Sequence, residues 1–578
     1  MSVPDGLPQR TTPLAVDGRA GRDAWWADLL AFLVLATIAV LVFRGGEQMA
    51  RPLSQLAASP VALDPANLPG YALRTTLRML AAMVASLLFT FVVATLAAKS
   101  RRAEMLIVPA LDILQSVPVL GFLTFTVTLF MGMFPGSQLG VECAAIFAIF
   151  TAQAWNMAFS VFQSIRTIPS DLDEVARQFR FSAWRRFVRL ELPFAVPGLV
   201  WNMMMSMSGS WFFVVASEAI TVGKTTVALP GIGSYLALAI GQEDFRAVAI
   251  AVAAMAIVIL LYDQLLFRPI VAWADRFRFE QTASGEAPKS WVYDLIRRSR
   301  FSRLSTRSLP AVPRLRLPLP SGRRRPRLTL PAMPEWLWRL LVALTCGAAS
   351  VELLLYLSSR LSFADLLVAL GDGSLTLLRV VVLIALASLV WVPVGVWIGL
   401  RPGWASRVQA LAQFLAAFPA NVLFPVAVIA IVHWHLSPDI WLSPLMVLGT
   451  QWYILFNVIA GASVIPTDMK EVARIYGLRG WQRWRQLLLP AIFPYYVTGA
   501  LTASGGSWNA SIVAEAVSWG RSTLTAHGLG AYIAAATTAG DFPRVALGIA
   551  VMSAFVVLFN RTLWRPLYRF AERRLRLD

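Results

Sequence analysis

The sequence predicts an all-α polytopic membrane protein made of two parallel six-helix repeats. Composition is the first reason: of 578 residues, 57% are hydrophobic and 14% are charged, whereas a soluble protein carries about 25% charged residues. Apolar runs such as Met79–Ala98 reach the roughly 20 residues that cross a bilayer and contain no charge. The third reason is an internal repeat, because Ile168–Arg177 returns almost unchanged as Ile465–Arg474.

Each half contains six apolar segments of spanning length, which predicts about twelve transmembrane helices. They lie near residues 25–43, 77–98, 105–130, 141–162, 194–216 and 246–267, and near 337–357, 377–400, 408–432, 440–460, 491–513 and 544–563. Helices are expected because lipid leaves unpaired backbone groups unsatisfied. The first segment is interpreted as a retained helix, since no clear signal-peptide cleavage site follows it.

The charge distribution divides the chain and orients it. We divide the sequence into residues 1–75 (tail, first helix and outer loop), 76–275 (first repeat domain), 276–335 (basic Pro/Arg-rich cytoplasmic linker), 336–375 (first helix of the second half and outer loop) and 376–578 (second repeat domain). Within the linker, Trp291–Arg298 is expected to form a short surface helix. Lys and Arg beside span ends mark the cytoplasmic side, which places both termini and both repeated loops there. The net charge of +19 then reflects attraction to the lipid bilayer rather than to nucleic acid.

The repeated loop is polar although apolar runs flank it. Asp171 with Glu174, and Asp468 with Glu471, have the spacing of a capping box at a helix start. An apolar stripe at helical spacing follows, formed by Leu172, Val175, Ala176 and Phe179 in one copy and by Met469, Val472, Ala473 and Tyr476 in the other. A helix lying on the membrane surface would explain the stripe alone. The recurring acidic pair and Leu-Pro at fixed spacing favour a helix that docks into a groove on a partner.

The residues Glu471-Val-Ala473, Gly477 and Leu489-Pro490 resemble the EAA loop of ABC importer permeases. Trp508 to Glu515 resembles the nitrate/sulfonate/taurine/bicarbonate subgroup. This resemblance implies an inner-membrane chain with two fused permease domains, whose loops 169–193 and 466–490 act as coupling helices for two cytoplasmic ABC ATPase subunits. It also implies that an extracytoplasmic solute-binding protein delivers a small solute, for which an anion fits the subgroup.

One position departs from the family pattern. The first copy has Arg180 where the motif has glycine, whereas the second copy keeps Gly477. Glycine suits a helix end with φ > 0, a conformation that arginine tolerates poorly. We therefore expect the two loops to dock unequally, with loop 465–490 coupling more tightly.

The fifth span of each half is rich in small and polar residues. These residues either allow close helix packing or line a pathway, where hydroxyls and amides replace water around a solute. The candidate pathway residues are Asn202, Ser206, Ser210, Trp211, Ser507, Trp508 and Asn509. Glu218 and Glu515 follow these spans, either as solvated or paired carboxylates or as an outer gate or binding-protein contact.

Other function classes fit less well. A gradient-driven transporter also often has six plus six helices, but its expected mid-membrane ionisable residues are few here, and Asp112 and Glu352 are not repeated. Gly223-Lys224-Thr225 lacks the upstream glycine of a phosphate-binding loop, so no nucleotide cofactor is expected. No catalytic constellation or metal motif supports a membrane enzyme, and a scaffold would not need polar fifth spans. The sequence therefore favours a transport subunit powered by a partner.

Overall fold

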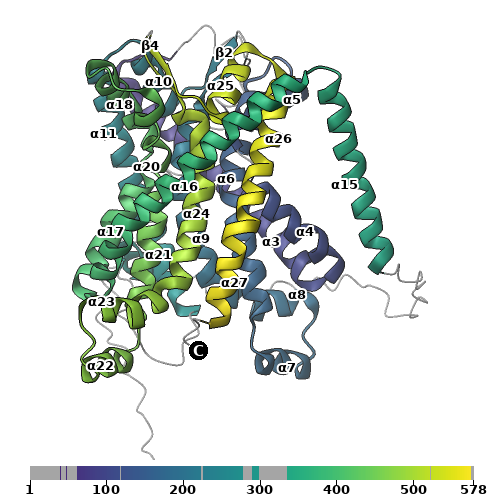
Figure 1. Ribbon diagram of the computed structural model, residues 1–578. Helices are drawn as coiled ribbons and strands as arrows, with labels where there is room; N and C mark the ends of the chain where they lie inside the picture. The colour runs from purple at the N-terminus through teal and green to yellow at the C-terminus, as the bar shows by residue number, and fades with distance from the viewer. Residues whose placement is uncertain are drawn as a thin grey trace, which may run out of the picture.

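The computed structural model describes residues 61–116, 119–222, 225–277, 290–298, 335–520 and 522–574, and the single positions Val40, Glu47 and Pro52. Within these ranges the chain is a bundle of long helices with two small β-hairpins at one end (Figure 1). This confirms the all-α polytopic class. The predicted span at 25–43, most of the linker and Gly223–Lys224 lie outside the described residues.

The first repeat runs from α3 to α12. Its elements are α3 (Leu68–Lys99), α4 (Arg101–Ser116), α5 (Val119–Met133), α6 (Gln138–Arg166), α7 (Ser170–Gln178), α8 (Ala183–Arg186), a π-helical turn (Phe187–Glu191), α9 (Leu192–Glu218), β1 (Ala219–Val222), β2 (Thr225–Ala228), α10 (Ile232–Gly241), α11 (Phe245–Tyr262) and α12 (Arg268–Ala274). The expected linker helix is present as α13 (Trp291–Arg298).

The second half begins with α15, the predicted first span, and then follows a similar order. Its elements are α15 (Glu335–Ser358), α16 (Phe363–Gly399), α17 (Pro402–Ala417), α18 (Phe424–His433), α19 (Pro438–Trp441), α20 (Leu445–Leu448), α21 (Gln451–Ser463), α22 (Thr467–Ile475), α23 (Gly480–Arg483), α24 (Leu489–Ala514), β3 (Ala516–Trp519), β4 (Ser522–Thr525), α25 (Leu529–Ala539), α26 (Phe542–Phe559) and α27 (Arg565–Arg574).

The number of complete spans is smaller than twelve in the described part of the chain. Eight helical stretches there are long and apolar enough to cross a membrane, and Pro438–Leu448 with Gln451–Ser463, bent by 43°, would form a ninth. The segment expected at 408–432 is broken into α17 and α18. The segment expected at 105–130 is described as α4 and α5, and residues 117 and 118 lie outside the described residues. The break between α17 and α18 contains Pro419, and proline removes a backbone donor and restricts the residue before it.

The capping-box prediction was wrong for both repeated loops. α7 begins at Ser170 after Pro169, and α22 begins at Thr467 after Pro466, and neither has a side-chain cap. Proline fixes φ just before the first turn, but its ring offers no acceptor for the unpaired N–H groups there. Asp171 and Asp468 instead lie inside the first turn, where the helix dipole favours negative charge.

The hairpins occupy the end of the bundle opposite α7 and α22, which we call the hairpin end (Figure 1). β1 pairs with β2 from Ala219↔Ala228, and β3 pairs with β4 in the equivalent register from Ala516↔Thr525. The two repeats also touch here. The Gly520 N–H donates to the Ile240 carbonyl at 3.0 Å, and the rings of Phe245 and Trp519 lie 4.6 Å apart. Sequence analysis did not anticipate the hairpins.

Candidate docking helices and central cavity

The two short helices α7 and α22 protrude from the end of the bundle opposite the hairpins (Figure 1). Each is nine residues long, and each turns one alanine, Ala176 or Ala473, inward at 4% exposure. The larger apolar residues of the stripe face outward, with Phe179 69% and Tyr476 77% exposed. The predicted stripe is therefore divided between an inner anchor and an outer apolar face.

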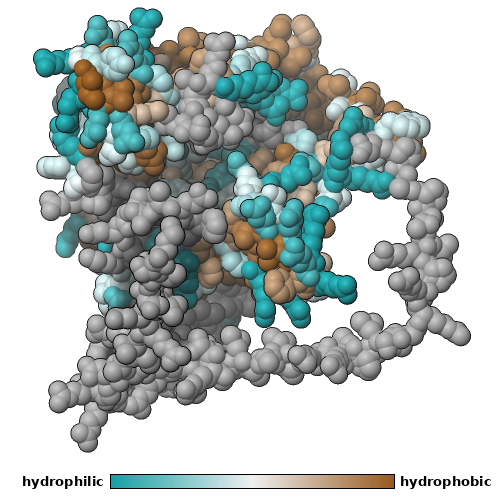
Figure 2. All heavy atoms as spheres, turned by 90° about the horizontal axis from the view of Figure 1, so that it is seen from below, coloured by the Kyte–Doolittle hydropathy of each residue, from teal (hydrophilic) through white to brown (hydrophobic). Residues whose placement is uncertain are grey.

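Polar residues surround these outer faces. Asp171, Glu174, Asp468 and Glu471 are exposed beside Val175, Val472 and Met469, and Leu172 is half-buried. Figure 2 views this end and shows hydrophobic patches bordered by hydrophilic residues. An apolar centre with a polar rim is the usual composition of a protein–protein interface.

The chain leaves both helices through the same left-handed turn. Arg180 has φ 49° and Gly477 has φ 64°. In each loop the next residue donates back into the helix, from Phe181 to Ala176 and from Leu478 to Ala473. The expectation of positive φ at this position is confirmed, and arginine there costs about 1 kcal/mol relative to glycine.

A chain of ion pairs attaches α7 to the bundle. Glu191 is 1% exposed, and its carboxylate lies 2.8 Å from Lys99 Nζ and 3.0 Å from Arg186 Nε. Arg186 also reaches Asp173 on α7 at 2.7 Å, and Asp173 pairs with Arg177. Sequence analysis missed this cluster because its members are spread over four elements.

The second repeat replaces this cluster. The equivalent positions there hold Leu400, Lys470, Arg483 and Leu488. Leu488 is 3% exposed, so an apolar side chain fills the place of the buried carboxylate. The two docking helices are thus held to the bundle by different physical means.

Glu218 is fully buried at the hairpin end. Its carboxylate accepts from Arg78 at 2.7 Å, from the Thr75 hydroxyl at 2.7 Å and from the Gly233 N–H at 2.7 Å. Arg78 also binds Glu142 through two nitrogens at 2.5 and 2.7 Å. The carboxylate thereby joins α3, α9 and the start of α10, with its charge balanced in the interior.

Glu515 has the same arrangement in a more open setting. It accepts from Arg379 at 3.0 Å, Thr376 at 2.9 Å and the Gly530 N–H at 2.8 Å. Burial raises the pKa of the Glu515 carboxyl, and the adjacent Arg379 opposes that rise. Arg379 also pairs with Asp439, whose side chain is 43% exposed. Both predicted gate carboxylates are therefore paired, and their arginine partners could have been found from their equivalent places in the two repeats.

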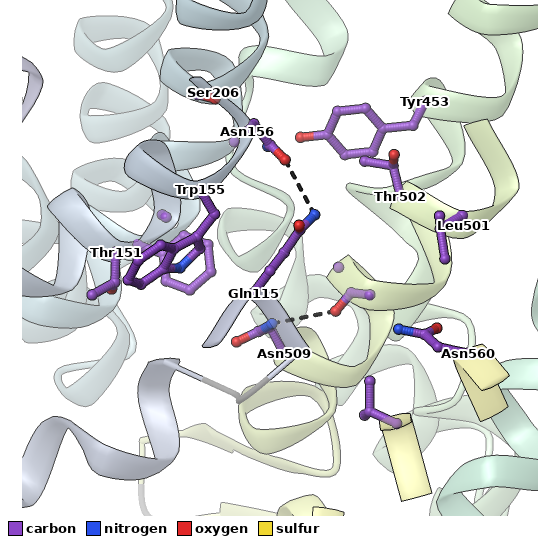
Figure 3. Close-up of a pocket in the computed structure, with 16 residues that line it drawn as sticks. Gln115, Thr151, Trp155, Asn156, Ser206, Tyr453, Leu501, Thr502, Asn509 and Asn560 are labelled. Atoms are coloured by element: carbon purple, nitrogen blue, oxygen red, sulfur yellow. Dashed lines mark hydrogen bonds between the residues drawn. The ribbon is translucent and has the colours of Figure 1, made fainter. Parts of the chain in front are cut away.

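A small cavity of about 160 Å³ lies between the two repeats. Its polar lining includes Gln115, Asn156, Tyr453, Asn509 and Asn560, with no charged residue among the described residues that line it. Figure 3 shows Gln115 beside Asn156, with their amides joined by a 3.2 Å hydrogen bond. The Trp155 indole N–H is buried without an acceptor in the described part of the chain. The cavity thus presents neutral hydrogen-bonding groups.

Two predicted pathway residues, Ser206 and Asn509, line this cavity. The others lie outside its lining and serve local contacts. Asn202 donates to the Gly198 carbonyl, Ser210 to Ser206 and Ser507 to Ala503. Trp211 and Trp508 are buried at 2% and 1% exposure. Sequence analysis missed Gln115, Asn156 and Tyr453, although Asn156 and Tyr453 occupy equivalent repeat positions.

Known proteins share this organisation. Residues 86–268 and 391–577 each match the family model of the binding-protein-dependent transport system inner membrane component. The chain is 30% identical over 134 residues to the bicarbonate transport system permease protein CmpB of Synechococcus elongatus, covering 23% of this chain and 45% of that protein. It is 28% identical over 158 residues to the nitrate import permease protein NrtB of Leptolyngbya laminosa, covering 27% and 52%.

A third relative is named for a different solute. The chain is 27% identical over 168 residues to the glycine betaine/proline betaine transport system permease protein ProW of Escherichia coli, covering 29% of this chain and 43% of ProW. The chain thus spans about half of the length of these curated relatives.

The fold and the site define a multi-pass membrane protein with a duplicated helical core and a short amphipathic helix projecting from each copy. The family model matches more than half of the sequence, and the chain belongs to the family of binding-protein-dependent transport system inner membrane components. The predicted resemblance to ABC permeases of the nitrate and bicarbonate type, fused in one chain, is confirmed. Members of this family are transport subunits and not enzymes.

Proposed function

We propose that this chain is the membrane-spanning part of an ATP-driven importer, with α7 and α22 as docking helices for two cytoplasmic ABC ATPase subunits. The observation that carries the proposal is the pair of short helices, each with an exposed aromatic residue, at one end of the bundle. A rigid helix seated in a partner's groove transmits the partner's movement to the spans on either side of it.

The remaining parts of the proposal follow from this arrangement. α7, α22 and both termini face the cytoplasm of an inner membrane, and the hairpin end faces an extracytoplasmic binding protein. Glu218 and Glu515 act at that end as gate elements, since each ties the fifth span of its repeat to the following short helix. The central cavity is a passage point for a small solute.

The solute class is constrained by the relatives and by the cavity. CmpB and NrtB are named for bicarbonate and nitrate, and we propose a small anion for this chain. No cation lines the cavity among the described residues. The passing anion would therefore be held by amide, hydroxyl and indole donors, as hydrogen bonding to a charged group is worth about 1.5–3 kcal/mol.

Co-purification with the ATPase tests the docking role. Phe179→Asp and Tyr476→Asp together place charge in both apolar faces and should abolish recovery of the ATPase with the chain. Trp291→Asp, on exposed α13, is the matched control and should leave recovery unchanged. Full recovery with the double variant would refute docking through α7 and α22.

Transport measurements test the passage. Asn509→Leu and Asn156→Leu remove amide donors from the cavity and should lower uptake of the transported anion without releasing the ATPase. Bicarbonate, nitrate and glycine betaine uptake should each be measured in vesicles with and without ATP. Uptake driven by an ion gradient without ATP would instead support the gradient-driven alternative.

A further inference from the structure

Two adjoining cavities lie between the repeats, and they differ in size and chemistry. The central cavity has a volume of about 160 Å³, and the second has about 80 Å³. The residues that line both are Gly209, Phe213, Tyr453 and Gly506. We propose that the transported anion binds in the central cavity alone, at a subsite formed by Ser206 and Trp155 of the first repeat. The inference rests on the proposed import function and adds to it the residues that hold the solute and the number of sites.

The second cavity is the counterpart of the central one in the duplicated chain. Ala416 lines the second cavity at the position that matches Gln115 of the central cavity. Phe212 lines it at the position that matches Asn509. Two amide side chains of the central cavity therefore correspond to an alanine and a phenylalanine in the second. The duplication has produced two related cavities, of which one is polar.

The polar side chains of the second cavity are bonded within the protein. The Ser208 hydroxyl donates to the Met204 carbonyl at 3.1 Å. The Thr450 hydroxyl lies 3.0 Å from the Ser507 hydroxyl, within hydrogen-bond distance. A charged solute that enters a cavity loses water and needs hydrogen bonds in exchange. The second cavity therefore compensates an anion poorly.

The central cavity contains two buried donors without a hydrogen-bond partner in the described part of the chain. They are the Ser206 hydroxyl and the Trp155 indole N–H. Both residues line the cavity and are labelled in Figure 3, and Ser206 is 3% exposed. Buried polar groups are nearly always hydrogen-bonded, so this pair indicates that a group from outside the chain completes the site.

The chemistry of the two donors suits an anion. An indole nitrogen can only donate, and a serine hydroxyl can donate as well. A negative charge on the acceptor strengthens both hydrogen bonds. The indole is held in position by edge-to-face contacts with Phe89 and Phe150, whose ring centroids lie 5.6 and 6.2 Å from that of Trp155. An oxyanion can therefore accept from a fixed indole N–H and from the Ser206 hydroxyl.

The second repeat does not reproduce this pair. Ala503 matches Ser206 and has no hydroxyl. Trp452 matches Trp155, but its ring packs against Trp391 with the centroids 5.1 Å apart. The first repeat therefore supplies both donors, and the structure assigns one anion site to each chain.

Equilibrium binding to the purified full chain tests the subsite. The protein in detergent is dialysed against radiolabelled bicarbonate and, separately, against radiolabelled nitrate, and the bound anion is counted per chain. We expect saturable binding of at least one of these anions, at one per chain. Ser206→Ala with Trp155→Phe should weaken it by at least about tenfold, because each change removes a hydrogen bond to a charged group. Ser206→Thr keeps the hydroxyl and should retain binding.

Ser217→Ala with Trp564→Phe is the matched control and should leave binding unchanged. Both residues are buried, and the Trp564 indole N–H also has no acceptor among the described residues. Neither belongs to the described lining of either cavity. Thermal unfolding establishes that each variant is folded.

Three results would each overturn the subsite. They are undiminished binding by the folded Ser206→Ala, Trp155→Phe variant, binding of two anions per chain, and no saturable binding of either anion to the folded unmodified chain. None of these measurements involves the ATPase. The import function is judged separately, by ATP-dependent uptake into vesicles that contain the complete transporter.

Discussion

The buried carboxylate of Glu191 can be tested in two ways: by removing the cations around it, or by removing the carboxylate itself. We expect the first change to destabilise the attachment of α7 more than the second. Lys99→Leu with Arg186→Leu removes both cations around it and leaves the charge buried. Removing the partners of a buried ion costs about 3–5 kcal/mol. Lys99 and Arg186 are each 36% exposed, so water already screens part of the attraction. We therefore expect the lower end of the range, about 3 kcal/mol.

Glu191→Leu removes the carboxylate instead. The two cations left behind are partly exposed and can be hydrated where they stand. The second repeat already accommodates leucine at the matching position, where Leu488 is buried. Replacement of buried ions by apolar side chains is often neutral, so we expect a loss of about 1 kcal/mol or less.

Amide hydrogen exchange over residues 170–191 measures the difference. A loss of about 3 kcal/mol corresponds to exchange that is on the order of 100-fold faster, whereas Glu191→Leu should change the rate by less than about tenfold. Lys470→Leu with Arg483→Leu in the second repeat is the control and should leave exchange in 170–191 unaltered. Equal acceleration by both first-repeat changes would show that the burial of Glu191 does not govern the attachment of α7.

Three further predictions concern backbone strain and buried charge. Arg180→Gly should raise the unfolding free energy by about 1 kcal/mol, and Gly477→Arg should lower it by a similar amount and weaken ATPase recovery, because both positions have positive φ; unchanged thermal unfolding would contradict this. Arg78→Leu should destabilise more than Arg379→Leu, by about 3 kcal/mol or more against about 1–2, since the Arg78 side chain is 0% and the Arg379 side chain 12% exposed. Gly528→Ala should destabilise the hairpin end, because the added Cβ would overlap the Glu515 carboxylate. Cleavage by chymotrypsin at the hairpin end should therefore increase.

The repeated loop is where sequence and structure agree most closely. Its helical stripe and the positive φ at Arg180 and Gly477 follow from local spacing and backbone chemistry. The inward direction of Ala176 and Ala473 does not, because their spacing placed them on the same stripe as the exposed residues. Its start was placed two residues too late because Asp171 resembles a cap, whereas the observed N-cap residue is Pro169. Local sequence patterns therefore predict that these helices form, but they do not determine the residue at which each helix begins.

The buried pairs and the cavity depend on tertiary contacts. Arg78 lies 140 residues from Glu218, and the fold brings them to 2.7 Å. Gln115 of α4 donates to Asn156 of α6. The sequence analysis had placed Gln115 inside one continuous apolar span at 105–130, so this contact was not expected. Hydropathy averages over such segments and so hides both the helix breaks and the isolated amides. Comparison of the two repeats position by position would have identified the arginines.

The contact between the repeats at the hairpin end limits how the molecule can move. The Gly520 N–H donates to the Ile240 carbonyl across the boundary, and the Phe245 ring contacts the Trp519 ring beside it in a tilted arrangement. Any motion that separates the two repeats at the hairpin end must first break the Gly520–Ile240 hydrogen bond and the Phe245–Trp519 ring contact. Among the described residues, no main-chain hydrogen bond joins α7 to α22, and the two helices lie apart. The two repeats are therefore joined directly at the hairpin end, whereas α7 and α22 are not bonded to each other in the described part of the chain.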